Sequence, residues 1–121
     1  MNRSRVFPLG AIMAALGILL GAFGAHALSD LSAKALGWWQ TATQYLFIAA
    51  LGVMLAGLLE RDRAPARSPA MALLAGAILF SGSLYGMALG GPRSLALATP
   101  IGGLSLVAGF VWLAVRGWRS R

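Results

Sequence analysis

Apolar residues gather into four long runs that are separated by short polar connections. The runs cover about residues 7–28, 38–59, 70–90 and 95–115. Each is roughly 20 residues long, enough to cross about 30 Å of hydrocarbon as a helix rising 1.5 Å per residue. None alternates with a period of two, so the pattern does not favour a barrel. It predicts an all-α integral membrane four-helix bundle, with residues 1–121 forming a single four-span domain.

Composition agrees with a membrane environment. Hydrophobic residues make up 59% of the chain and charged residues 11%, with a mean hydropathy of +0.77. A soluble domain of this size needs more charge to cover its surface, so the expected partner is the lipid bilayer. Trp38 and Trp39 begin the second run, and Trp112 and Trp118 lie near the end of the fourth. These positions suit the aromatic belts found at membrane interfaces.

The start of the chain also imitates a secretory signal peptide. Basic residues precede an apolar run that ends at Ala25-His26-Ala27. The run is longer than the usual apolar core of a signal peptide, which has about 7–15 residues. We therefore interpret it as the first membrane span.

Basic residues are unevenly distributed over the connections between the runs. Eight basic residues lie before the first run, between the second and third runs, or after the fourth run, which places them on one side of the membrane. They are Arg3, Arg5, Arg61, Arg63, Arg67, Arg116, Arg119 and Arg121. The other two connections hold Lys34 and Arg93 only. Positively charged connections stay on the cytoplasmic side, so both termini are expected in the cytoplasm. No basic face interleaved with base-reading groups is visible, and no nucleic-acid partner is expected.

Small residues recur at intervals of three and four in three of the runs. The candidate helix-packing glycines are Gly17, Gly21, Gly24, Gly82, Gly86, Gly90, Gly102 and Gly109. In lipid, such residues let helix backbones approach closely, which supplies van der Waals contact. The stripes suit packing within the bundle or a dimerisation face, and we favour packing because each helix must first find its neighbours. Leucine at Gly21 or Gly86 is expected to push helices apart.

Uncharged polar residues concentrate in what this orientation makes the outer half of the bundle. The candidates for a polar cluster or ligand site are His26, Gln40, Gln44, Tyr45, Ser81, Ser83, Tyr85 and Thr99. Polar groups in lipid are tolerated when they face protein or water. The sequence therefore predicts either a hydrogen-bonded cluster or a shallow cleft open to the outer side. Thr99 and Pro100 also suit a helix start, as N-cap and first helical residue.

His26, the only histidine of the chain, leaves three interpretations open. The first, which we favour, is a structural residue held by a hydrogen bond. The second is a residue that contacts a ligand or exchanges a proton, and the third is a metal ligand. Asp30, one turn further on, is placed to pair with it or to cap the helix. A metal site is not expected, because one histidine lacks the companion ligands that metals require.

The chain contains few of the residues and motifs that enzymes use for catalysis. All three acidic residues lie at the edges of the runs and the chain has no cysteine. A proton-coupled transporter usually needs a carboxylate within the membrane, and a nucleophilic triad needs an acid beside a histidine. No phosphate-cradling motif is present. We therefore expect no enzyme and no cofactor.

The run Gly21-Ala22-Phe23-Gly24-Ala25-His26-Ala27-Leu28-Ser29 resembles the hallmark of the DUF423 family, also called UPF0382, of small bacterial inner-membrane proteins. Related eukaryotic sequences are called transmembrane protein 256. Three further blocks agree in order: Gly37-Trp38-Trp39-Gln40-Thr41 with Tyr45, Leu79-Phe80-Ser81-Gly82-Ser83-Leu84-Tyr85, and Thr99-Pro100-Ile101-Gly102-Gly103 with Ser105. The resemblance implies a multi-pass inner-membrane protein of a functionally uncharacterised family. Members of this family often have a second histidine near the position of Ala49, where this chain has an apolar residue. The absence of that histidine disfavours a metal site further.

Two functions stay open. The favoured one is a non-enzymatic accessory or scaffold bundle that forms a homo-oligomer or joins another membrane subunit. The alternative is a binding or transport module for a small amphiphile, lipid or quinone-like, in an outer-side polar cleft. Its lining would be His26, Gln44, Tyr45, Ser81 and Tyr85. A scaffold should have these groups mutually satisfied, whereas a binding module should have them around one cavity.

Overall fold

The computed structural model describes residues 5–27, 30–59 and 69–119. Within them lie α1 (Val6–Ala27), α2 (Ala33–Leu59), α3 (Pro69–Ala88), the 3-10 helix η3 (Arg93–Leu97) and α4 (Ala98–Arg119). The described part contains four helices long and apolar enough to cross a membrane, the fourth counted with η3, which confirms the all-α membrane fold. Several features named above lie outside the described residues, namely Arg3, Leu28, Ser29, Arg61, Arg63, Arg67 and Arg121.

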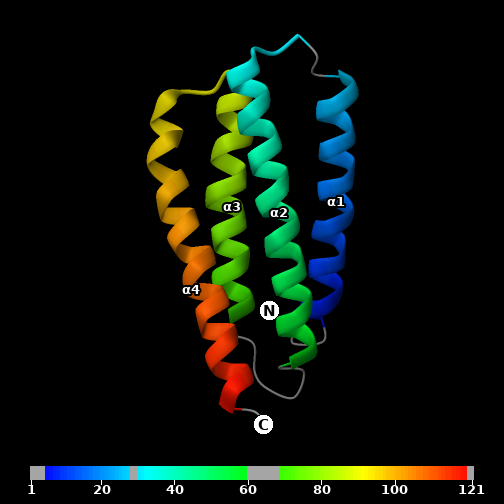
Figure 1. The fold of residues 1–121 in the computed structure, drawn as a ribbon, viewed down its shortest axis with the longest axis vertical. Coiled ribbons are helices and arrows are strands. Elements are labelled where there is room, and N and C mark those ends of the chain that lie inside the picture. The colour runs from blue at the N-terminus through cyan, green and yellow to red at the C-terminus, as the bar shows by residue number, and fades with distance from the viewer. Residues whose placement is uncertain (1–4, 28–29, 60–68, 120–121) are drawn as a thin grey trace.

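The helices form an up-and-down bundle in which each packs against the next along the chain (Figure 1). Contact between α2 and α4 is slight, so α1 and α4 lie at the two flanks. The bundle has a distal end, where α1 and α3 stop and α2 and α4 start, and a proximal end, where α1 starts and α4 stops. The placement of the proximal end in the cytoplasm stays a prediction.

The second helix begins at Ala33, earlier than the apolar run at Trp38 indicated. Ser32 is the reason, because its Oγ accepts a hydrogen bond from the backbone N–H of Ala35 at 3.1 Å. This is the N-cap geometry, and it satisfies one of the free N–H groups of the first turn. The polar residues that suggested a connection therefore form the first turns of α2.

The third helix ends before Gly90, which the sequence placed within a glycine stripe. Gly90 has φ +95°, a left-handed conformation that glycine adopts without strain. Its N–H bonds to the carbonyl of Met87 at 3.1 Å, and the N–H of Gly91 bonds to that of Gly86 at 2.8 Å. This pair is the Schellman motif, so Gly90 terminates α3 rather than packing it against a neighbour.

The start of α4 differs from the expected cap. Thr99 lies inside α4, which begins at Ala98, and its side chain bonds to Ser83 instead of capping the helix. Pro100 stands in the first turn, where its missing N–H leaves no hydrogen bond unmade. The preceding residues Arg93–Leu97 form η3, so α4 begins later than the apolar run.

Four of the eight predicted packing glycines lie where two long helices touch closely, namely Gly17, Gly24, Gly102 and Gly109. Gly17 faces the Phe47 ring and Gly24 faces the Trp39 indole, so the stripe of α1 packs against α2. Between α3 and α4, a Cβ on Gly109 would lie 2.9 Å from the Leu73 side chain, which is fully buried. Sequence reasoning missed further glycines of this kind, which are Gly52, Gly57 and Gly76.

The glycine run of α3 is the exception. A Cβ on Gly82 would meet nothing within 4 Å, because Gly82 lines an open groove between α1 and α3. Gly86 faces Leu95 of η3 at 2.8 Å rather than one of the long helices. The predicted packing role is therefore wrong for Gly82, since α1 does not reach over that face of α3.

Candidate functional site

The distal half of the bundle contains a layer of hydrogen bonds centred on Trp39. This side chain is 4% exposed, so it is a packed core residue and not the interfacial aromatic that its position suggested. Its Nε1 donates to the carbonyl of Leu20 in α1 at 2.8 Å. Its ring lies edge-on to that of Tyr85 in α3, with centroids 4.5 Å apart. One residue of α2 therefore contacts the helices on both sides.

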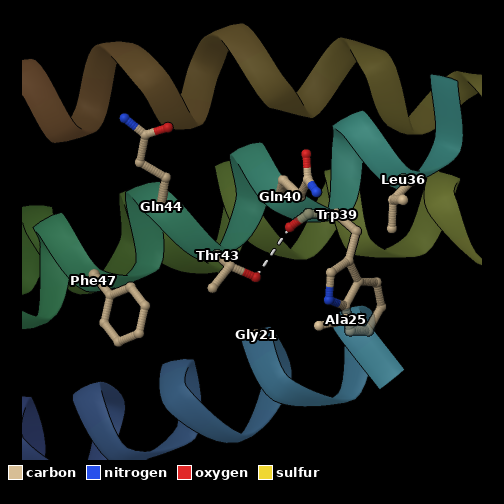
Figure 2. A pocket seen from close by; sticks show the side chains of 9 residues that line it. Gly21, Ala25, Leu36, Trp39, Gln40, Thr43, Gln44 and Phe47 are labelled. Atoms are coloured by element: carbon tan, nitrogen blue, oxygen red, sulfur yellow. Dashed lines mark hydrogen bonds between the residues drawn. The ribbon is translucent and has the colours of Figure 1, made fainter. Parts of the chain in front are cut away.

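Thr43 lies one turn further along α2 and extends the layer. Its hydroxyl donates to the carbonyl of Trp39 at 3.0 Å (Figure 2) and lies 2.6 Å from the hydroxyl of Tyr85. A threonine hydroxyl carries one hydrogen, so Tyr85 is the donor of the second bond. Both polar groups are satisfied within the bundle.

Serines complete the layer between the remaining helices. Ser81 donates to the carbonyl of Ala42 at 2.8 Å, which joins α3 to α2. The hydroxyls of Ser83 and Thr99 lie 2.6 Å apart and join α3 to α4. Nearer the proximal end, Ser105 donates to the carbonyl of Ala72 at 2.8 Å. Each neighbouring pair of helices is thus tied by at least one side-chain hydrogen bond.

Four of the predicted site residues stay outside this layer. His26, Gln40, Gln44 and Tyr45 are exposed, and none forms a hydrogen bond with another described residue. The structure therefore provides no hydrogen-bond partner for His26 among the described residues, although a hydrogen-bonded role was the favoured interpretation. Asp30 forms no ion pair with His26. Tyr45 stacks its ring against that of Phe80 at 4.8 Å.

The predicted cleft is not one cavity, because its expected lining is divided among three hollows. Gln44 lines a hollow of about 360 Å³ between α1 and α2. Ser81 and Tyr85 line a groove of about 370 Å³ between α1 and α3. Tyr45 lines a groove of about 700 Å³ on the α2–α4 side.

Metal ligands do not gather in the described part of the chain. Among residues 5–27, 30–59 and 69–119, no three side chains of His, Cys, Asp or Glu lie close enough together to hold an ion.

Sequence reasoning did not assign Trp39, Thr43 or Ser105 to the site. A usable signal existed for the first two. Trp39 and Thr43 stand four residues apart on one helical face, and a buried indole N–H requires an acceptor. Their partners on α1 and α3 had no comparable signal.

We expect the bond between Thr43 and Tyr85 to stabilise the bundle modestly. Thr43→Val and Tyr85→Phe should each reduce the free energy of unfolding by about 0.6–1.7 kcal/mol, the range for interhelical hydrogen bonds in membranes. The double variant should cost less than the sum, which a double-mutant cycle from denaturant titration in micelles measures. Ser83→Ala is a control on another helix pair, and its effect should add to that of Thr43→Val. Additive losses from Thr43→Val and Tyr85→Phe would contradict a direct bond.

Comparison with known proteins identifies relatives over nearly the whole chain. Residues 20–103 match the family model described as "Protein of unknown function (DUF423)". A UPF0382 membrane protein of Haemophilus influenzae is 38% identical over 123 residues, covering 98% of each chain. The UPF0382 inner membrane protein YgdD of Escherichia coli K12 is 40% identical over 114 residues, covering 92% of this chain and 87% of its own. No solved structure matches. With its four spans, the chain is a multi-pass inner-membrane protein, and it belongs to the DUF423 (UPF0382) family.

Proposed function

We propose that this protein is a non-enzymatic assembly element of the membrane, whose partner docks on the edge between α1 and α2. The observation that carries the proposal is a contrast within one helix. Thr43 is buried and satisfied by Tyr85, whereas Gln40 and Gln44 are exposed and bond to no described residue. Groups that are satisfied inside the bundle serve its fold, and those left outside are available to a partner.

The depth of Gln44 gives this contrast its weight. It lies about 17 Å along α2 from Ala33, at 1.5 Å per residue, which is beyond the interfacial region of a span. Water is scarce at that depth, so an amide without a partner is costly. An adjoining helix that offers a donor and an acceptor removes that cost.

The surface beside the two glutamines suits a close helix contact. Gly21 and Ala25 of α1 line the same hollow of about 360 Å³ as Gln40 and Gln44. In Figure 2, Trp39, Thr43 and Phe47 point from α2 towards α1, while the side chains of both glutamines project away from these three. Small residues beside amides are the usual composition of helix interfaces in membranes.

A second copy of the chain is the partner we favour. A glutamine amide both donates and accepts, so two identical faces can pair across a two-fold axis. Native mass spectrometry of protein released from native membrane patches should then detect a homodimer. Gln40→Leu with Gln44→Leu should convert it to monomer.

Thr41→Val is the matched control, because it also removes a polar group from α2 but does not line the hollow. It should leave the dimer intact. A wild-type monomer would contradict the proposal, as would a double variant that remains dimeric. A fixed complex with a different membrane protein, lost in the double variant, would retain the assembly role and replace the partner.

Amphiphile binding is the second candidate function, and the α2–α4 groove favours it. At about 700 Å³ the groove is within the range of about 300–1,000 Å³ typical of small-molecule sites. Its lining is almost wholly apolar, which suits an alkyl chain. Gln40 and Gln44 do not line this groove, so the two candidates can be tested separately.

A further inference from the structure

A small charged cavity lies at the distal end of the bundle, where the start of α2 meets the end of α3 and η3. Its volume is about 260 Å³, and its lining is about equally polar and apolar. Its lining residues are Ser32, Lys34, Trp38, Met87, Gly91 and Arg93. Two segments distant in sequence, residues 32–38 and 87–93, therefore meet at one site.

Both basic residues of the distal connections line this cavity. Lys34 comes from the first turn of α2 and Arg93 from the start of η3. Neither forms an ion pair with a carboxylate of the described residues, Asp30 included. Two cations that share a cavity repel each other, so an anion between them would be stabilised by both.

Other groups at the cavity favour the same ligand. The first turn of α2, which Ser32 caps, carries the partial positive charge of a helix N-terminus. The Lys34 ammonium lies 5.4 Å from the centre of the Trp38 ring, a cation–π contact that places it at the cavity wall. Indole rings are common at the headgroup level of a bilayer.

The α2–α4 groove follows the same face of α2 towards the membrane interior. Lys34, Trp38 and Tyr45 stand at intervals of four and seven residues, so they lie on one side of the helix. Trp38 lines the charged cavity, and Tyr45 lines the groove together with Pro100 and Gly103 of α4. An apolar hollow thus lies below a cationic one.

We propose that the charged cavity binds the phosphate of an anionic phospholipid and that an acyl chain of this lipid occupies the α2–α4 groove. Arginine and lysine side chains both bind phosphate oxygens through charge-assisted hydrogen bonds. The apolar groove favours a lipid over free phosphate, which has nothing to place there. The proposal does not require the assembly role. It assigns a ligand class and a site to the amphiphile-binding alternative.

Lipid retention in native mass spectrometry tests the charged cavity. The full chain in micelles is titrated with phosphatidylglycerol and, in parallel, with phosphatidylcholine of the same acyl chains. Wild type should retain one phosphatidylglycerol more tightly than phosphatidylcholine. Lys34→Gln with Arg93→Gln should weaken phosphatidylglycerol binding about thirtyfold, because each basic group near a membrane surface contributes a factor of about five.

Arg5→Gln with Arg119→Gln is the matched control, since it removes two exposed charges at the proximal end. Its binding should equal that of wild type. The single variants K34Q and R93Q, each expected to lose about fivefold, serve if the double variant does not fold. Equal retention of both lipids by wild type would overturn the proposal, as would lipid binding that is unchanged in these variants.

The groove is tested by filling it. A Cβ on Gly103 would lie 3.6 Å from the Phe80 ring, so Gly103→Leu has room to extend into the groove. It should reduce phosphatidylglycerol binding at least tenfold, while Gly82→Leu, which lines a different groove, should not. Inorganic phosphate that binds as tightly as the lipid, with no effect of Gly103→Leu, would show a free-anion site and overturn the lipid assignment. Q40L/Q44L should still bind the lipid, so failure here is distinct from failure of the assembly role.

Discussion

Gly102→Leu is expected to separate α3 from α4 and to prevent the bundle from reaching its native packing. A Cβ on Gly102 would overlap the backbone nitrogen of Phe80 and lie 2.9 Å from the carbonyl carbon of Leu79. Backbone cannot rotate away as a side chain can, so the whole helix must move. The free energy of unfolding should fall by at least the ~1–3 kcal/mol that overpacking typically costs.

Gly82→Leu is the matched control, because it makes the same exchange where a Cβ would meet nothing within 4 Å. Circular dichroism, size-exclusion elution and denaturant titration in micelles compare the two variants with wild type. We expect Gly82→Leu to fold normally and Gly102→Leu to elute as aggregate or to unfold at lower denaturant. Equal stabilities of the two variants would contradict the close approach of α3 and α4.

The choice of Gly102 differs from the expectation drawn from the sequence, which selected Gly21 as a position where leucine would push helices apart. Gly21 stood in the longest glycine stripe, yet its Cβ would lie 3.5 Å from a Thr43 methyl group, an ordinary contact. Gly10, Gly57 and Gly102 instead face the backbone of a neighbouring helix. Glycine spacing identifies which residues share a face, but the distance to the opposite helix depends on how that helix approaches.

The four spans could be predicted because hydrocarbon imposes one constraint on every residue of a span. Backbone groups must bond internally, so a long apolar run has little choice but to be helical. Helix ends follow different rules. The start of α2 depends on the Ser32 cap, and the end of α3 depends on the conformation of Gly90. Both lie among polar residues that apolarity alone assigns to connections.

The sequence predicted how deep in the bundle the polar residues of the candidate site lie. It did not predict which face of each helix they occupy. Polar residues do concentrate in the distal half, where Thr43, Ser81 and Tyr85 form the hydrogen-bonded layer. Sequence placed Gln40 and Gln44 in the same cluster, yet they lie on the exposed side of α2. Because α2 is apolar on nearly all sides, its sequence contains little information on which face meets the other helices.

Trp39→Ala is expected to release α1 from the distal half of the bundle. The indole fills the space beside Gly24, donates to the Leu20 carbonyl and packs on Tyr85. Truncating a buried tryptophan costs about 3–5 kcal/mol in soluble cores. Lipid is as apolar as the core, so the loss here comes from packing and the hydrogen bond, and we expect the lower part of that range.

Two further variants divide this effect into its causes. Trp39→Phe keeps a ring against Tyr85 but removes the N–H, so it should cost about 0.6–1.7 kcal/mol, as interhelical hydrogen bonds in membranes do. Trp118→Ala makes the same truncation as Trp39→Ala, but at a residue that is 76% exposed, so it should reduce the free energy of unfolding only slightly. The free energy of unfolding is measured in micelles, and a spin-label pair on α1 and α2 reports their separation. If Trp39→Ala costs no more than Trp118→Ala, α1 is held by its glycine contacts alone, and the Trp39 layer is not what joins it to the bundle.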